Sequence, residues 1–268
     1  LDGKLLSAYH FELNNQNISE MDVVFFSLYP KNLEIALAEY CPKLKNGCLV
    51  LDGCGNKRKV VKQMKELAKK YGLLILEDNP YGDLRVSGED VPSIKSFDED
   101  GIVIYAGSFS KLLAPGIRVG YIVAPSEIIA KMTVGKQAAD VHTPVFSQML
   151  VDKWMEQNDV DAHIEKIRGI YGEKLNLMCD LIDSELGDFV KYVRPEGGLF
   201  VWAKLNDGID MLDFVKKASA AGASVVPGNA MMVDGDAPCQ YIRLNFSTPS
   251  DEDIVKGVKI LGEVARSL

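Results

Sequence analysis

The succession of an amphipathic helix and short apolar runs in the first half of the chain constrains its fold most. Residues 57–72 place apolar side chains at helical spacing, with lysines opposite: Val60, Val61, Met64, Leu67, Ala68 and Tyr71. Apolar runs follow at 73–78, 101–108 and 118–125, and such runs are typical of strands buried on both faces. The alternation of strand, helix and strand predicts a parallel α/β sheet.

The pattern changes after residues 162–186, a long helical stretch without an internal proline. Strand patterns at 189–205 and 240–247 then alternate with helical patterns at 210–222 and 251–268. We therefore expect three parts in the chain. A large α/β domain covers 1–160, a connecting helix covers 161–186, and a small α+β domain covers 187–268.

The composition limits the functions to consider. The 268 residues carry a formal net charge of −8, whereas a general nucleic-acid binder normally shows a basic face. No apolar run approaches the roughly 20 residues needed to cross a bilayer. The five cysteines form no CxxC pair and the three histidines lack metal-ligand spacing. We expect a cytoplasmic protein with free thiols, no bound metal, and neither nucleic acid nor membrane as a partner.

Two of the predicted strands end in polar clusters. One ends at Asp78 in the segment EDNPYGDLR, and the next ends at GSFSK, residues 107–111. Ligands of open α/β sheets bind outside the carboxyl ends of the strands. If these strands are neighbours, five side chains converge on one crevice: Asp78, Tyr81, Ser108, Ser110 and Lys111.

A lysine in this company suits pyridoxal phosphate. That cofactor needs an amine for a Schiff base, a carboxylate near its ring nitrogen, and hydroxyl, N–H and guanidinium donors for its phosphate. Simpler interpretations exist for each residue taken alone. Lys111 would then be a solvated lysine, Asp78 a turn residue, Ser108 and Ser110 helix caps, and Arg118 a structural ion-pair residue.

The segment SFSKLLAPGIRVGY (108–121) resembles the lysine motif of fold-type-I, class I/II aminotransferases, and LEDNPYGDLR (76–85) resembles their DxxY segment. RPEGGLFVW (194–202), VVPGNAM (225–231) and YIRLNFS (241–247) resemble their small-domain segments, in the family's order. The resemblance is greatest to the branch with 2-aminoadipate aminotransferase and the catalytic domains of MocR regulators. It implies a large, mostly parallel domain and a small α+β C-terminal domain.

The resemblance also assigns roles to residues. Lys111 would form the internal aldimine with pyridoxal 5'-phosphate and move a proton between the substrate α-carbon and the cofactor. Asp78 would pair with the ring nitrogen, Tyr81 would donate to the ring oxygen, and Arg243 would bind the substrate α-carboxylate. The phosphate would be held by three residues: Ser108, Ser110 and Arg118.

Two departures from the family pattern stand out. Family members carry a further half-domain before the position matching Val23, with a glycine-rich phosphate loop and an aromatic residue that stacks on the cofactor. Residues 1–20 contain no version of either. The family's asparagine segment would fall near 50–53, where Gly53 matches, with Asn56 nearby. We therefore expect this chain by itself to bind the cofactor more weakly than a full-length relative.

The leading hypothesis is a homodimeric aminotransferase that moves an amino group between an α-amino acid and a 2-oxo acid. Another reaction of the same cofactor, such as β-elimination, is the nearest alternative. A second class is the ligand-sensing domain of a GntR/MocR-type transcription regulator. A third is a truncated, non-catalytic remnant.

Overall fold

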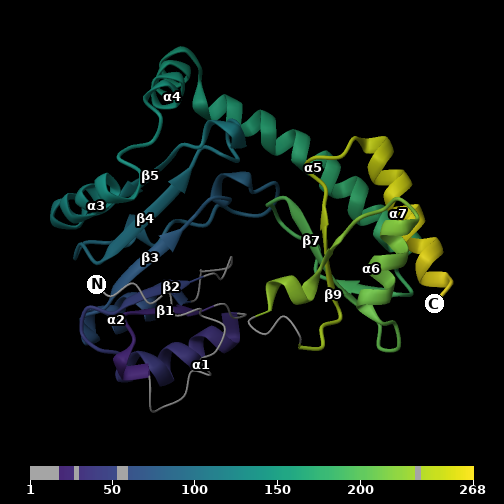
Figure 1. The fold of residues 1–268 in the computed structure, drawn as a ribbon, viewed down its shortest axis with the longest axis horizontal. Helices are drawn as coiled ribbons and strands as arrows, with labels where there is room; N and C mark the ends of the chain where they lie inside the picture. The colour runs from purple at the N-terminus through teal and green to yellow at the C-terminus, as the bar shows by residue number, and fades with distance from the viewer. Residues whose placement is uncertain (1–17, 27–29, 53–59, 233–236) are drawn as a thin grey trace. The chain divides into compact units, whose positions relative to one another are not determined.

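The structure is a computed structural model that describes residues 18–26, 30–52, 60–232 and 237–268. The chain forms two compact units (Figure 1). The first unit contains the described residues up to Asp83 together with Glu89–Val160, and the second contains Leu84–Gly88 together with Asp161–Leu268. The predicted connecting helix corresponds to α5, Val160–Glu185.

The first unit is built on a five-stranded sheet in sequential order: β1 (Val23–Phe26), β2 (Leu49–Asp52), β3 (Leu74–Asp78), β4 (Val103–Ser108) and β5 (Gly120–Val123). Strands β1 to β4 are parallel. Helix α1 (Pro30–Tyr40) connects β1 to β2, and α2 (Val60–Tyr71) connects β2 to β3. The predicted α/β class with a mostly parallel sheet is confirmed.

Strand β5 departs from the parallel pattern. It pairs with β4 in the antiparallel sense, with Ser108 opposite Gly120. The connection between these two residues holds turns and the 3₁₀ helix η6 (Pro115–Ile117). A parallel return needs a crossover of a dozen or more residues, usually a helix, so this short loop reverses the chain instead.

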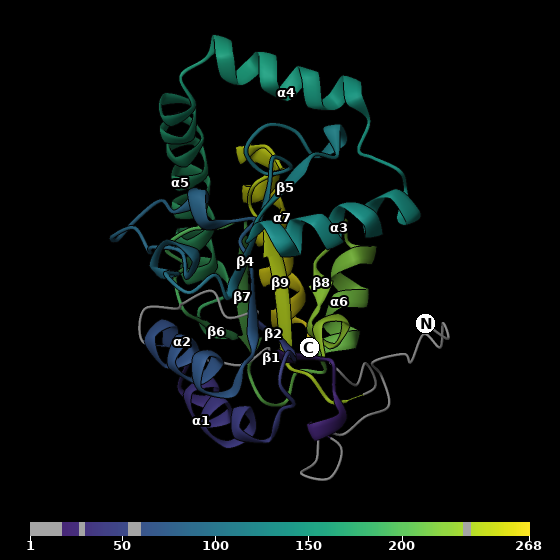
Figure 2. The same cartoon turned by 90° about the vertical axis from the view of Figure 1, so that its left-hand side faces the viewer.

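Burial differs between the two faces of this sheet. Val24, Val50, Ile75 and Val103 share one face and are buried in a core with α1 and α2, which lie on the same side of β1 and β2 in both views (Figures 1 and 2). On the other face of β1, Phe25 keeps 56% of its surface exposed. Strand β5 is mostly exposed as well. The prediction that the apolar run at 118–125 is buried on both faces is therefore wrong for β5.

Helices α3 (Ser126–Ala139) and α4 (Val145–Gln157) also expose apolar side chains. Among their residues, Val151 is the one side chain classed as buried. We call the following set the α3–α4 apolar surface: Met132, Val134, Val145, Phe146, Met149 and Leu150. Each of these side chains keeps at least 41% of its surface exposed, so these faces of α3 and α4 are candidate contact areas.

The second unit is an α+β structure, as predicted for the C-terminal part. Its antiparallel sheet has the strand order β6 (Val190–Tyr192), β7 (Phe200–Leu205), β9 (Tyr241–Asn245) and β8 (Val226–Pro227). Helices α5, α6 (Met211–Ala220) and α7 (Asp251–Arg266) share a buried core with this sheet, and α6 lies beside β8 (Figure 2). No helix within the described ranges is long and apolar enough to span a membrane.

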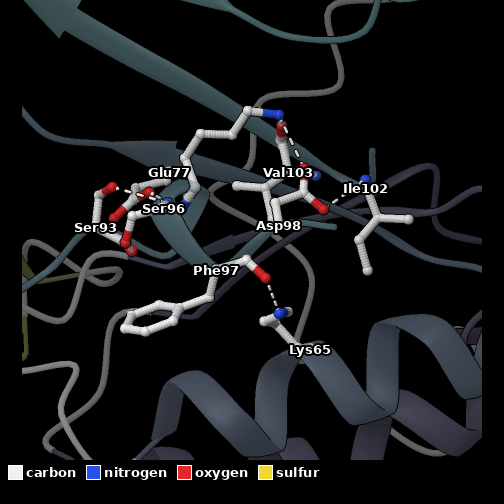
Figure 3. Close-up of polar contacts among 9 residues, drawn as sticks. Lys65, Glu77, Ser93, Ser96, Phe97, Asp98, Ile102 and Val103 are labelled. Atoms are coloured by element: carbon white, nitrogen blue, oxygen red, sulfur yellow. Dashed lines mark hydrogen bonds and ion pairs between the residues drawn. The ribbon is translucent and has the colours of Figure 1, made fainter. Parts of the chain in front are cut away.

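A loop between β3 and β4 is fixed by a network of polar contacts (Figure 3). We call residues Ser93–Asp98 of this loop the brace segment. The Asp98 carboxylate accepts hydrogen bonds from the Ile102 and Val103 amides at 3.1 and 3.0 Å, and from Lys95 Nζ at 2.8 Å. Burial alone would raise the pKa of Asp98, but these hydrogen bonds from Lys95, Val103 and Ile102 hold it below its ordinary value of 3.8.

Asp98→Asn should therefore lower the free energy of unfolding at pH 7 by about 1.5–3 kcal/mol, since hydrogen bonds to an ionised group are lost. A lowered folded-state pKa means that Asp98 stabilises the fold fully above its ordinary pKa of 3.8 and loses this effect as the pH falls through the lower folded value. Urea denaturation at several pH values measures the free energy of unfolding of both proteins. The difference between the variant and the parent should become smaller as the pH falls below about 3.8.

Asp100→Asn is the matched control for this experiment. Asp100 pairs with the largely exposed Lys69 at 2.9 Å, and exposed ion pairs contribute about 0–1 kcal/mol. An Asp98→Asn effect as small as that of the control, or one that stays constant down to pH 3, would contradict the assigned role.

Candidate active site

The carboxyl ends of β3 and β4 place two of the predicted residues at one edge of the sheet. Asp78 ends β3, is exposed, and lies in register with Ala106 of β4. Ser108 ends β4 two residues further on, so its side chain faces the same side of the sheet as Asp78. The Asn79 amide donates to the Ala106 carbonyl at 3.0 Å, which extends the ladder between the strands past Asp78.

Lys111 lies in a closed loop after β4. The Phe109 amide donates to the Val119 carbonyl at 3.1 Å and closes the loop, and the Leu113 amide donates to the Phe109 carbonyl at 2.8 Å. The Lys111 Nζ atom lies 6.0 Å from the centroid of the Tyr81 ring. Within the described part of the chain no carboxylate pairs with Lys111, so its amine is not engaged in a structural ion pair.

Three potential phosphate ligands meet in the same loop. Arg118 Nη1 donates to Ser110 Oγ at 3.3 Å and to the Pro115 carbonyl at 3.1 Å, and the Ser110 amide donates to Ser108 Oγ at 3.1 Å. Arg118 has φ 55°, in the left-handed region that is uncommon for residues other than glycine. The arginine is exposed and has further N–H donors available to an anion, which fits the phosphate role.

The sequence predictions missed a tyrosine cluster on the opposite face of β3 and β4. Tyr121 of β5 pairs with Gly107 of β4, and its ring packs against this glycine. A Cβ atom on residue 107 would lie 2.2 Å from the Tyr121 ring, so any larger residue there would force the ring to move. Asn79 Nδ2 donates to the Tyr105 hydroxyl at 3.2 Å, and the Tyr105 and Tyr121 ring centroids are 6.1 Å apart. Burial, with a smaller effect of Tyr121, raises the pKa of Tyr105 to about 12, so its phenol stays neutral near pH 7. The sequence feature that could have indicated this cluster is Gly107, a glycine inside the apolar run at 101–108.

Arg243 lies in the second unit, in the middle of β9. Its guanidinium carbon is 4.2 Å from the centroid of the Phe200 ring, and its Nη1 is 4.0 Å from Met231 Sδ. Its Nε is buried without a hydrogen-bond partner, and no carboxylate of the described residues pairs with it. A half-buried arginine without a counter-ion is suited to bind an anionic ligand.

The structure thus places the predicted site residues of the first unit in three pairs. Lys111 lies near Tyr81, Arg118 contacts Ser110, and Asp78 and Ser108 share the carboxyl edge of the sheet. Gly53 and Asn56 fall outside the described residues. In the ranges that the structure describes, no cluster of three or more His, Cys, Asp or Glu side chains is arranged to hold a metal.

A mostly parallel sheet with a lysine loop after its fourth strand, followed by a small antiparallel α+β unit, defines the fold-type-I class of pyridoxal-phosphate-dependent transferases. A family model described as "Aminotransferase class I and II" matches residues 11–261. The chain belongs to this family of aminotransferases.

Three known proteins show the degree of similarity. The aromatic-amino-acid aminotransferase 1 of Thermococcus litoralis is 44% identical over 76% of this chain and 49% of its own length. The 2-aminoadipate transaminase of Thermus thermophilus is 34% identical over 77% of this chain and 52% of its own. The crystal structure of the multiple substrate aminotransferase of Thermococcus profundus superposes with a TM-score of 0.80 at 36% identity, over 88% of this chain and 60% of that one. The chain therefore spans about half the length of the curated relatives it matches.

Proposed function

We propose that the protein is a pyridoxal-phosphate-dependent aminotransferase that moves an amino group between an α-amino acid and a 2-oxo acid. The observation that carries the proposal is the Lys111 amine beside Tyr81, without a carboxylate partner among the described residues. It lies in the loop that also presents Ser110 and Arg118. When bound, pyridoxal phosphate supplies an aldehyde that reacts with amines and a ring that accepts electrons from the substrate.

Lys111 would attach the cofactor through Nζ and later carry the proton that leaves the substrate α-carbon. Tyr81 would hydrogen-bond the ring oxygen of the cofactor. The supporting observation is that its ring lies 6.0 Å from the same amine.

Asp78 would hold the proton on the ring nitrogen, which keeps the ring an electron acceptor. Its carboxylate is exposed at the end of β3, and none of the described residues donates a hydrogen bond or an ion pair to it. Ser108, Ser110 and Arg118 would bind the phosphate with hydroxyl, amide and guanidinium donors. The contact between Arg118 and Ser110 already places two of these donors together.

Arg243 would bind the substrate α-carboxylate. Arg243→Lys should raise KM by about 10–100-fold with a smaller change in kcat, because one of two charge-assisted hydrogen bonds is lost. Steady-state kinetics with varied amino acid measures both constants. Arg194→Lys in the same unit is the control. Arg194 already forms an ion pair with Asp180 at 3.2 Å and is not assigned to the substrate, so its replacement should leave KM unchanged. Unchanged KM in Arg243→Lys would show that the carboxylate is bound elsewhere.

The alternatives have less support. The relatives and the solved structure named above are all aminotransferases and are more similar to this chain than the HTH-type transcriptional regulators that it also matches, at 31% and 28% identity. No observation on the described residues favours β-elimination. For location, the four described cysteines (Cys41, Cys48, Cys179 and Cys239) are all free. This supports a cytoplasmic protein, because free thiols persist in a reducing compartment. We also propose a homodimer, for which the α3–α4 apolar surface is the candidate contact.

The proposed activity has a direct test. The purified chain, saturated with pyridoxal phosphate, is given an α-amino acid and a 2-oxo acid, and the new amino acid is measured. Formation of the new amino acid together with the 2-oxo acid of the donor supports transamination. Release of ammonia with loss of a side-chain group would indicate elimination instead, and cofactor binding without turnover would favour a sensing domain or a remnant.

A further inference from the structure

We infer that Glu77 is a positioning residue that fixes Asp78 through the brace segment; this rests on the role proposed for Asp78. Glu77 is the one charged or polar residue classed as buried among the described residues, with 2% of its surface exposed. It immediately precedes Asp78 on β3. Because side chains alternate along a strand, the two carboxylates lie on opposite faces of the sheet.

Both oxygens of the Glu77 carboxylate are occupied. Oε1 accepts from the Ile94 amide at 2.8 Å, and Oε2 accepts from the Lys95 amide at 2.9 Å. Figure 3 shows Glu77 beside the turn that contains Ser93 and Ser96. A buried carboxylate needs such compensation, and two charge-assisted hydrogen bonds make this a strong attachment between β3 and the brace segment.

The other end of the brace segment is attached to β4. Lys95 Nζ donates to the Val103 carbonyl at 2.8 Å and to Asp98 Oδ2, and Asp98 in turn accepts from the Val103 amide. The Lys65 amine on α2 donates to the Phe97 carbonyl. Glu77 therefore ties the carboxyl end of β3 to a segment that is itself fixed on the first residue of β4.

Asp78 depends on this attachment because its own side chain has no anchor. Within the described residues no hydrogen bond or ion pair holds its carboxylate. Its place is set by the backbone of β3, which pairs with β4 through contacts such as the Asn79 amide to the Ala106 carbonyl. Loss of the Glu77 attachment should loosen this end of the strand and with it the position of Asp78.

Glu77→Gln tests the inference without a change of shape. Glutamine offers one acceptor oxygen, and its NH₂ group would face the second backbone N–H, so one attachment is lost. Glu77→Asp is a second variant that keeps the charge and shortens the reach. Ser96→Ala is the matched control, because it removes the bond from Ser96 Oγ to the Ser93 carbonyl in the same segment and does not touch Glu77.

Amide-resolved hydrogen exchange on the full chain without cofactor is the first measurement. In Glu77→Gln the Asn79 amide should exchange about 10–100-fold faster, together with the Ile94 and Lys95 amides. The Ile75 amide, which bonds the Ile102 carbonyl at the other end of β3, should change much less. Faster exchange at Ile94 and Lys95 with the parent rate at Asn79 would overturn the inference. So would an equal change in Ser96→Ala.

A double-mutant cycle is the second measurement, read from the absorbance of bound pyridoxal phosphate as the pH is varied. Glu77→Gln should change the pH at the midpoint of this absorbance change when Asp78 is present. In an Asp78→Ala background it should cause no further change in the midpoint. Equal shifts in both backgrounds would overturn the inference. If Asp78→Ala alone changes nothing, or no cofactor binds, the proposed function fails instead, and the hydrogen-exchange result still decides whether Glu77 positions Asp78.

Discussion

Replacing Lys111 with arginine is expected to remove all covalent attachment of pyridoxal phosphate and to lower amino transfer by at least about 10³-fold. Lysine would serve both as the attaching nucleophile and as the proton carrier, and both roles need an amine that can lose its proton. A guanidinium keeps the positive charge next to Tyr81 but stays protonated near neutral pH. The loss should therefore follow from chemistry rather than from a change of charge.

Borohydride reduction followed by peptide mass mapping measures the attachment directly. In the parent chain with excess cofactor, the pyridoxyl group should be fixed on the peptide that contains Lys111. Lys131→Arg is the matched control, because Lys131 is an exposed lysine of α3 in the same unit. Label scattered over exposed lysines with Lys111 unmodified, or a Lys111→Arg variant as active as the control, would contradict the assignment.

The strands that carry the candidate site could be predicted because their sequences are nearly all apolar and short. The runs at 73–78 and 101–108 correspond to β3 and β4, and the helical pattern before them corresponds to α2. Strand β1 was not predicted, since four residues are too few for periodicity to distinguish a strand. The direction of β5 could not be read either, because it depends on the conformation of the loop after Ser108 and not on the apolar run itself.

Some contacts within the site could likewise be predicted from the sequence, and others could not. Ser110 and Arg118 lie eight residues apart in one closed loop, so a local motif was enough to associate them. The tyrosine cluster depends on strand register, which places Gly107 opposite Tyr121. Glu77 likewise stands beside Tyr105 only in the folded sheet, and its buried partners come from a loop about 17 residues away. Spacing along the sequence does not reveal such register-dependent contacts.

The second large effect is expected at the α3–α4 apolar surface. Phe146 is 78% exposed and Met149 is 64% exposed, one turn apart on the same face of α4. Burying one large apolar side chain contributes about 1.5–3 kcal/mol. If this surface forms the proposed homodimer contact, replacing Phe146 and Met149 with serine removes about 3–6 kcal/mol of association free energy for the two side chains that one copy buries. Because both copies carry the substitutions, the dissociation constant should rise by at least about 10²-fold.

Sedimentation velocity over a range of protein concentrations measures this change. The parent chain should show a dimer at concentrations where the Phe146→Ser, Met149→Ser variant is a monomer. Lys153→Ser with Glu156→Ser is the matched control, because these residues form an exposed ion pair at 2.9 Å on the same helix. At concentrations where both proteins are monomers, the free energy of unfolding of the double variant should stay within about 0.5 kcal/mol of that of the parent, because Phe146 and Met149 are largely exposed in the single chain. A parent chain that stays monomeric, or a serine variant that dimerises as tightly as the parent, would show that this surface is not the contact between two copies of the chain.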